Sequence, residues 1–258
     1  MNNTANITGF DFSRLTLQET VDQVEQWATD PSVRGKCLAI VNPHSVETAF
    51  RDPEFAAAIR AADLVTPDGV GILLASKILG AGIPEVVNGP DLFEALCRQL
   101  NAKKTGTKMF FLGSTPDNLN AIEDKFKTDF PNLGIAGTFS PPYKPQFSQD
   151  DLAAMIDLIN QSGADILWVG LGAPKQEKWA QACRHRLNVK VIAPVGGVFD
   201  FYTGRIRLPP KWVQKLGLIF LYRFFQEPRR LWRRNLDSPL FLCRVIAQKV
   251  QGLKGSKG

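Results

Sequence analysis

Few residues in this chain are of the kinds that build metal sites or disulfide frameworks. Its 258 residues include four cysteines and two histidines. The cysteines lie far apart without a Cys-x-x-Cys pair, and neither His44 nor His185 has a cysteine or histidine partner at ligand spacing. A zinc site and a disulfide framework are therefore not expected, and a reducing cytosol fits the cysteine pattern best. We expect no metal and no other cofactor.

Long apolar runs are missing as well. No stretch approaches the ~20 apolar residues of a membrane span, and Met1–Ala5 lack the basic and apolar regions of a signal peptide, so we expect neither. A content of 44% hydrophobic and 22% charged residues is typical of a globular protein. No linker rich in Pro, Gly or Ser splits the chain before its tail. We therefore expect one domain over residues 1–209 and an appendage over residues 210–258.

Charge is unevenly distributed along the chain. The net charge is +6, but residues 210–258 carry eleven Lys and Arg against two acids, and the first 209 residues carry 20 basic and 23 acidic groups. A nearly neutral body is thus followed by a strongly basic tail. This pattern indicates a polyanionic partner for the tail, such as phospholipid, nucleic acid or a diphosphate.

Apolar runs alternate with amphipathic stretches along the body. The runs predict strands at residues 7–10, 37–41, 62–65, 109–112, 134–139, 166–169 and 189–193. The amphipathic stretches predict helices at residues 16–29, 45–50, 53–61, 69–79, 149–161 and 175–187, with two more beginning near residues 88 and 114. Strands and helices in this order form parallel units with right-handed crossovers. We predict an α/β fold, a Rossmann-like, mostly parallel sheet with helices on both faces, followed by a basic helical C-terminal appendage.

Several predicted strands end in glycine or in a short polar side chain. These positions are Asn42, Asp68, Gly113, Gly170 with Gly172, and Gly196 with Gly197. Glycines at strand ends let backbone amides and helix N-termini approach a phosphate, which favours a nucleotide-type ligand. No standard fingerprint is complete, because Gly170-Leu171-Gly172 lacks the third glycine and no P-loop sequence occurs. Plain packing is the alternative for any single loop.

Thr66-Pro67-Asp68-Gly69 is either a turn or a site. Pro, Asp and Gly in this order are typical of a turn, but they also place a carboxylate where ligands bind at the end of a parallel strand. His44 follows a strand end too, and ligand contact and capping are equally compatible with it. His185 lies among arginines and is expected on a solvated face.

Lys175-Gln176-Glu177 places a cation and an amide at a helix N-terminus. They are in reach of an anionic or hydroxyl-bearing ligand there. Alternatively, Glu177 only complements the helix dipole.

The tail combines aromatic and basic residues at helical spacing. Between residues 211 and 224 aromatic and aliphatic residues alternate with Lys and Arg, Glu227-Pro228 breaks the pattern, and Arg229-Arg230-Leu231-Trp232-Arg233-Arg234 follows. This composition indicates interfacial helices on an anionic lipid surface. A solvated helix packed on the body is the alternative. Nucleic-acid binding is not expected, because no known module accompanies the basic residues.

Taken together, the motifs of the chain resemble the WecG/TagA/CpsF family of bacterial glycosyltransferases. The resemblance rests on Asn42-Pro43, Thr66-Pro67-Asp68-Gly69-Val70-Gly71, Gly89-Pro90-Asp91-Leu92, Phe111-Leu112-Gly113, the stretch from Val169 to Glu177, Gly196-Gly197-Val198-Phe199-Asp200, Tyr222-Arg223 and Glu227-Pro228-Arg229-Arg230-Leu231. It implies a metal-independent, inverting transfer of a sugar from a UDP-sugar to a sugar on a polyprenyl diphosphate. The expected location is the inner face of the cytoplasmic membrane, on the pathways to teichoic acid, capsule or exopolysaccharide. The absence of an Asp-x-Asp sequence agrees with metal independence.

The resemblance also assigns roles to residues. Asp68 would be the general base, and Asn42 and Gln176 would contact the sugar or nucleotide. The full set implied for substrate binding is Asn42, Thr66, Gly69, Gly89, Asp91, Gly113, Gly170, Gly172, Lys175, Gln176, Gly196, Gly197 and Asp200. Arg223, Arg230 and Arg233 match the basic appendage, which would close over the site and meet the lipid diphosphate. The sequence does not decide whether the protein acts as a monomer or as a homo-oligomer.

The chain departs from the family pattern at two positions. Family members often have Thr two residues before the Asn and Arg five residues before the Asp of the Gly-x-Asp element, and this chain has Ile40 and Val86 there. The donor is therefore left open among N-acetylmannosamine, its uronate, glucose or a similar sugar. The alternative function is a non-catalytic scaffold that binds a nucleotide-sugar or a lipid diphosphate.

Overall fold

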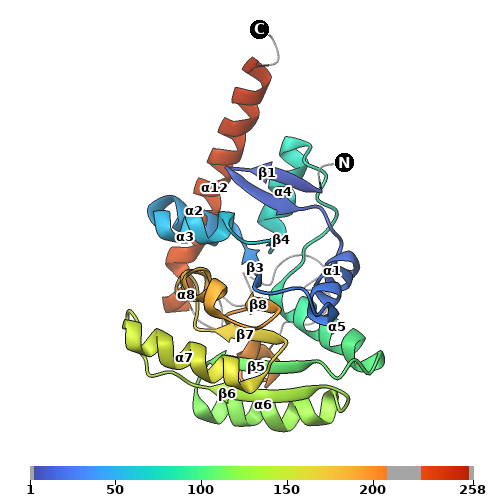
Figure 1. Ribbon diagram of the computed structural model, residues 1–258. Helices are drawn as coiled ribbons and strands as arrows, with labels where there is room; N and C mark the ends of the chain where they lie inside the picture. Colours follow the sequence, from blue (N-terminus) through green and yellow to red (C-terminus); the bar gives the residue numbers. More distant parts are fainter. Residues whose placement is uncertain (1–2, 208–227, 256–258) are drawn as a thin grey trace.

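A computed structural model describes residues 3–207 and 228–255 of the chain (Figure 1). Six parallel strands form the central sheet in the order β4-β3-β8-β7-β5-β6. Their bounds are β3 Lys36–Val41, β4 Leu64–Pro67, β5 Lys108–Gly113, β6 Gly134–Phe139, β7 Ile166–Gly170 and β8 Val191–Pro194. The predicted α/β class with a parallel sheet is confirmed.

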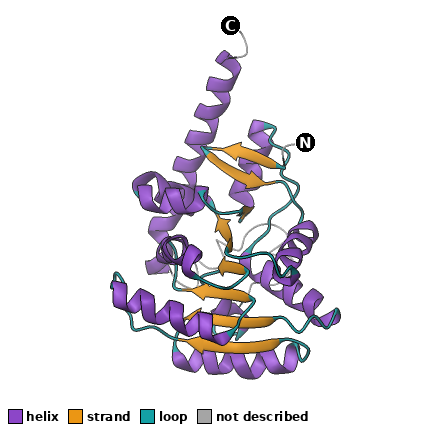
Figure 2. Ribbon diagram, viewed as in Figure 1, coloured by secondary structure: helices purple, strands orange, loops and turns teal. Residues whose placement is uncertain are grey.

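Helices follow the strands and cover the sheet on both sides (Figure 2). They are α1 Leu17–Thr29, α2 Pro43–Arg51, α3 Pro53–Arg60, α4 Val70–Leu79, α5 Gly89–Ala102, α6 Pro116–Asp129, α7 Gln149–Ser162, α8 Lys175–Cys183, α9 Val198–Tyr202 and α12 Pro228–Gly255. Several begin in the same way: Asn42, Asp52 and Thr115 each cap a helix with a side-chain oxygen, and proline occupies the next position. The first residue of a helix has no acceptor for its backbone N–H, so proline loses no hydrogen bond at this position. The side-chain cap and the proline together therefore stabilise these helix starts.

Two sequence predictions of element bounds are wrong. The predicted strand over residues 7–10 is the turn of an antiparallel hairpin, β1 Thr4–Ile7 with β2 Phe10–Ser13. Thr8 and Gly9 both have positive φ there, which a strand does not allow. The helix predicted over residues 175–187 ends at Cys183 and continues as a 3₁₀ turn, Arg184–Arg186.

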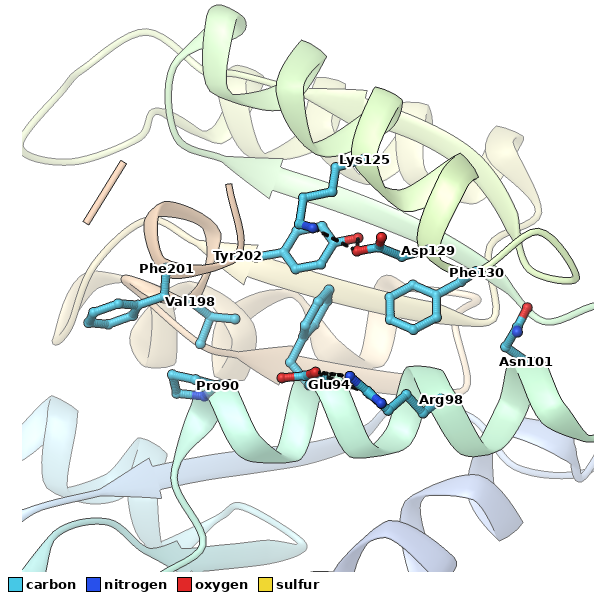
Figure 3. A pocket seen from close by; sticks show the side chains of 11 residues that line it. Pro90, Glu94, Arg98, Asn101, Lys125, Asp129, Phe130, Val198, Phe201 and Tyr202 are labelled. Carbon is cyan, nitrogen blue, oxygen red and sulfur yellow. Dashed lines mark hydrogen bonds and ion pairs between the residues drawn. The ribbon is translucent and has the colours of Figure 1, made fainter. Parts of the chain in front are cut away.

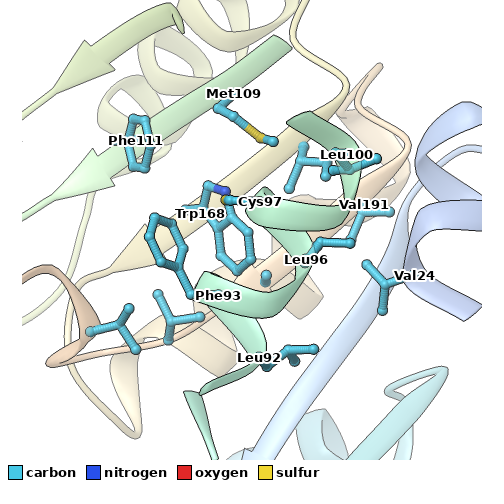
Figure 4. Close-up of a cluster of buried hydrophobic side chains, with 14 of the residues drawn as sticks. Val24, Leu92, Phe93, Leu96, Cys97, Leu100, Met109, Phe111, Trp168 and Val191 are labelled. Carbon is cyan, nitrogen blue, oxygen red and sulfur yellow. The ribbon is translucent and has the colours of Figure 1, made fainter. Parts of the chain in front are cut away.

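The strands alternate their side chains between two packed layers. Phe111 and Trp168 face α1, α5, α6 and α9, whereas Phe110 and Leu167 face α7 and α8. In the first layer Phe93 of α5 packs edge-on against Trp168, with ring centroids 4.9 Å apart (Figure 4). Such contacts fix the helices against the sheet and hold its carboxyl edge in a single geometry.

The C-terminal helix α12 packs on the body of the protein. Phe241 and Val245 are fully buried in a cluster with residues of α2, α3, α4 and the hairpin. Beyond this contact α12 extends away from the sheet (Figure 1). No helix among the described residues is long and apolar enough to cross a membrane. The predicted boundary at residues 209 and 210, and Arg223, lie outside the described residues.

Candidate active site

The carboxyl ends of β3, β4, β7 and β8 surround a cavity of about 460 Å³. This is the edge of a parallel sheet at which α/β proteins bind ligands. The lining residues that had been predicted from the sequence are Asn42, His44, Asp68, Gly89, Gly172, Gln176, Gly196, Gly197 and Asp200. Ile40 and Glu177 line it as well. Loops far apart in the sequence therefore meet as the glycine pattern indicated.

Asp68 is held beside Asn42 by the pairing of β3 with β4. Val41 is in register with Pro67, so the two following residues are neighbours. The Asn42 Oδ1 accepts hydrogen bonds from the Ser45 backbone and hydroxyl at 3.0 and 3.1 Å, and its Nδ2 donates to the Asp68 Oδ2 at 3.2 Å. Because capping α2 occupies the amide oxygen, only the NH₂ group can face Asp68.

Two neighbours of Asp68 do not reach the cavity. Thr66 is fully buried within β4, and Gly69 does not line the cavity. Gly69 has φ +86°, a conformation that glycine adopts readily, and it turns the chain from Asp68 into α4. The stretch is therefore a turn as well as a candidate site, with Asp68 as its only side chain at the cavity.

Gln176 lines the cavity too, with a side-chain amide that is hydrogen-bonded at both ends. Its Oε1 accepts from the Gly172 backbone at 3.1 Å, and its Nε2 donates to the Glu177 Oε1 at 2.9 Å. A Cβ atom on Gly196 would lie 3.6 Å from both amide atoms. The side chain thus bridges the loops that follow β7 and β8.

Glu177 is the cavity residue whose environment the sequence did not reveal. Its side chain is buried, and its Oε2 has no hydrogen-bond partner among the described residues. Burial raises the pKa of Glu177 to about 7. The sequence places Glu177 near the start of a helix, but it does not reveal that α3 packs against this helix, α8.

His44 connects the cavity with the C-terminal helix. Its Nδ1 lies 2.5 Å from the Asp237 Oδ2, and Arg51 also pairs with Asp237. Burial acts to raise the pKa of Asp237, but the hydrogen bonds from Arg51 and His44 outweigh it and lower the pKa. One carboxylate of α12 thus binds both ends of α2.

The amino-acid sequence matches the model of the glycosyl transferase WecG/TagA/CpsF family over residues 5–255. The chain belongs to this family. It is a glycosyltransferase, and the resemblance stated from the motifs is confirmed.

Two relatives of this glycosyltransferase carry the same name, N-acetylglucosaminyldiphosphoundecaprenol N-acetyl-β-D-mannosaminyltransferase. The protein of Bacillus spizizenii (strain W23) is 30% identical over 248 residues, which cover 96% of this chain and 93% of the relative. The protein of Bacillus subtilis (strain 168) is 27% identical over 246 residues, which cover 95% and 92%. The similarity therefore extends over nearly the whole of each chain.

Two glycines of this glycosyltransferase that are predicted to bind the ligand lie outside the cavity lining, at points of close packing. A Cβ atom on Gly113 would lie 2.5 Å from the Gly170 carbonyl oxygen, and one on Gly170 would lie 2.6 Å from the Phe199 ring. Neither residue lines the cavity. Glycine is required at both positions because β5, β7 and α9 approach one another closely.

Two polar residues predicted to bind the ligand, Asp91 and Lys175, also lie outside the cavity lining. The Asp91 side chain is exposed and accepts from the Asn88 amide at 2.6 Å, as part of the cap of α5. The Lys175 Nζ binds the Lys144 carbonyl and lies 3.7 Å from the centroid of the Phe147 ring, outside the cavity lining. Asp200 does line the cavity and accepts from Asn118 at 3.1 Å.

A second cavity, of about 490 Å³, adjoins the first and shares Pro90, Val198 and Phe201 with it. Figure 3 shows Glu94 paired with Arg98 on one wall, and Lys125 with Asp129 on the other. Each of these charges has an opposite partner four residues away on the same helix. Within the described ranges no three His, Cys, Asp or Glu side chains gather as metal ligands would.

Proposed function

We propose that this enzyme transfers one sugar, with inversion and without a metal ion, from a UDP-sugar to the sugar of a polyprenyl diphosphate. The observation that carries the proposal is the Asp68 carboxylate, held by Asn42 in the lining of a cavity that the Gly172 and Gly196-Gly197 loops line as well. In the proposal Asp68 is the general base and the glycine loops bind the diphosphate of the donor. The names of the relatives support N-acetylglucosamine on undecaprenyl diphosphate as the acceptor and N-acetylmannosamine as the sugar transferred.

In the proposed reaction Asp68 accepts the proton of an acceptor hydroxyl. The hydroxyl oxygen attacks the anomeric carbon on the face opposite to UDP, the bond from that carbon to the diphosphate oxygen breaks, and UDP leaves with the electron pair. A single displacement inverts the anomeric configuration. A positioned carboxylate base contributes roughly 10²–10⁴-fold to such a step.

Backbone amides of the glycine loops would bind the diphosphate of the donor. Gly172 and Gly196 have φ +82° and +57°, a conformation that favours glycine. Their own amides donate to the Gln176 Oε1 and to the Val169 carbonyl, so other amides of these loops would meet the diphosphate. Arg223, Arg230 and Arg233 would add cations from the tail, as the family resemblance implies. The tail would also hold the enzyme against the anionic inner face of the cytoplasmic membrane, where a polyprenyl acceptor is embedded.

The identity of the donor sugar can be determined by a screen of UDP-sugars. Ile40 places an apolar side chain on the cavity wall, so the choice among related sugars has to be measured. Release of UDP is to be followed with UDP-N-acetylmannosamine, its uronate, UDP-N-acetylglucosamine and UDP-glucose, each with and without N-acetylglucosaminyl diphosphate on a short prenyl chain. We expect acceptor-dependent release from one of them. Binding of a UDP-sugar without turnover on any acceptor would favour a scaffold instead.

A further inference from the structure

We infer that Glu177 is a positioning residue of this glycosyltransferase, which fixes the Gln176 amide against the donor in the cavity. The inference rests on the proposed function, because it takes the ligand of the cavity to be a UDP-sugar. It adds a role for a residue that the family resemblance left without one.

The hydrogen bonds of Gln176 form a chain that ends on Glu177. The Gly172 amide donates to the Gln176 Oε1, and the Gln176 Nε2 donates to the Glu177 Oε1, at 3.1 and 2.9 Å. The Gly172 N–H can only donate and the Glu177 carboxylate can only accept, so the two partners together fix which end of the amide faces each of them. One hydrogen of the Gln176 NH₂ group is left for a ligand oxygen. Without Glu177, only the hydrogen bond from the Gly172 amide would oppose a half-turn that presents the amide oxygen to the ligand.

At this position a carboxyl group makes the folded state less stable than an apolar side chain of similar size would. Glu177 is 7% exposed, and its Oε2 has no partner among the described residues. An unpaired buried carboxylate oxygen destabilises the folded state, and a methionine or leucine would fill the space without that effect. A destabilising polar group at the wall of a ligand cavity is therefore best explained by what it does for the ligand.

The cations near Glu177 in the sequence are engaged elsewhere. Lys178 pairs with Asp52 and Glu54 at 2.6 and 3.1 Å, and Lys175 binds the Lys144 carbonyl. The first turn of α8 thus holds a carboxyl group that neither lysine neutralises. Burial raises the pKa of this carboxyl to about 7, which agrees with its isolation from cations. The other titratable groups around the cavity are His44, Asp68 and Asp200.

A double-mutant cycle on UDP binding tests the inference. The dissociation constant of UDP is to be measured by calorimetry for the wild type, Gln176→Ala, Glu177→Met and the double variant. If Glu177 acts through Gln176, we expect Glu177→Met to weaken UDP binding about tenfold in the wild-type background and less than about twofold in the Gln176→Ala background. Glu177→Gln retains an oxygen that can accept from Gln176, so we expect it to bind UDP within about twofold of the wild type.

Each other outcome overturns the inference in a distinct way. An equal loss from Glu177→Met in both backgrounds would show that Glu177 acts on UDP independently of Gln176. Unchanged binding by Glu177→Met would show that it has no role in the donor site, and a tenfold loss in Glu177→Gln would show that the negative charge itself is needed. If the wild type does not bind UDP at all, the proposed function fails first. Circular dichroism and thermal unfolding of each variant control for misfolding.

Discussion

At the residue scale the candidate site contains amide side chains whose oxygen and NH₂ group bind different partners. Asn42 caps α2 with its oxygen and holds Asp68 with its nitrogen. Gln176 joins the β7 loop to Glu177 in the same manner. Both side chains thus support the fold and line the cavity as well. This double use is why capping and ligand contact could not be told apart in the sequence.

Replacing Asp68 by Asn should remove the base and keep the geometry. The amide oxygen of the new side chain can still accept from Asn42, so we expect the fold and donor binding to be retained. We expect kcat to fall by roughly 10²–10⁴-fold. Steady-state kinetics of Asp68→Asn measures this, with Asp157→Asn on the exposed side of α7 as the matched control. Retention of more than half of the wild-type kcat by Asp68→Asn would rule out the assigned base.

Replacing Glu177 by Gln should stabilise the protein, and more so at high pH. The pKa of Glu177 is raised to about 7, so between its ordinary value of ~4.3 and 7 the folded state binds more protons than the unfolded state. Wild-type stability therefore falls as the pH rises through this window, whereas the amide does not titrate. Urea unfolding should give little difference at pH 4 and a gain on the order of 3 kcal/mol at pH 8. A gain independent of pH would contradict the assignment.

At the element scale, close approach between strands and the docking of α12 fix the cavity. β5 and β7 meet at Gly113 and Gly170, where a single additional methyl group would collide with backbone or ring atoms. The second feature is the docking of α12, which packs against α2 and α4. Both features lie outside the cavity lining but determine where the surrounding loops start.

Replacing Gly113 by Ala should act on stability rather than on ligand binding. The new Cβ would lie 2.5 Å from a backbone oxygen, and φ is +110°, so the strand pair has to shift. We expect a loss of about 2–4 kcal/mol in unfolding free energy, the range of severe core defects. Gly252→Ala is the control, because a Cβ there meets nothing within 4 Å. Urea unfolding compares the two, and a neutral Gly113→Ala would remove the packing explanation.

Replacing Asp237 by Asn should loosen α12 from α2. The variant weakens the bonds to His44 and Arg51, and we expect a loss of about 1–3 kcal/mol at neutral pH together with faster amide hydrogen exchange in residues 241–250. The pKa of Asp237 is lowered, so this contribution is present above the ordinary carboxyl pKa and disappears as the pH falls through the lowered one. The control is Glu94→Gln in an exposed pair, which should change stability by less than about 0.5 kcal/mol. Identical exchange of α12 in both variants would contradict the docking role.

At the scale of the whole molecule, the sequence predicted the class of fold and the meeting of the strand-end loops at one cavity, because both follow from the order of elements. Strand ends rich in glycine and polar residues had to meet at one edge of a parallel sheet. The sequence could not separate Gly172, at the cavity, from Gly113 and Gly170, between strands, since all three follow strands in similar loops. It likewise could not show that Lys175 turns away while Glu177 turns in, because that depends on α3 and the loop containing Lys144.

The basic tail supports a prediction about membranes. We expect the protein to sediment with liposomes containing anionic lipid and not with neutral ones, because clustered Lys and Arg contribute about 1 kcal/mol each near such a surface. A variant with Arg229, Arg230, Arg233 and Arg234 changed to Gln should lose most of this binding. It is preferable to a truncation, since Phe241 and Val245 of the same helix are buried in the core. Equal sedimentation of the variant and the wild type would contradict an electrostatic role.

The central claim is that one sugar passes from a UDP-sugar to a lipid-linked sugar with inversion and without metal. Mass spectrometry and NMR of the lipid product, formed from UDP-N-acetylmannosamine and N-acetylglucosaminyl diphosphate on a short prenyl chain in the presence of EDTA, test it most directly. We predict an acceptor heavier by one sugar residue, with the anomeric configuration opposite to that of the donor. A product with retained configuration, or no product from any UDP-sugar of the donor screen until a divalent cation is supplied, would contradict it.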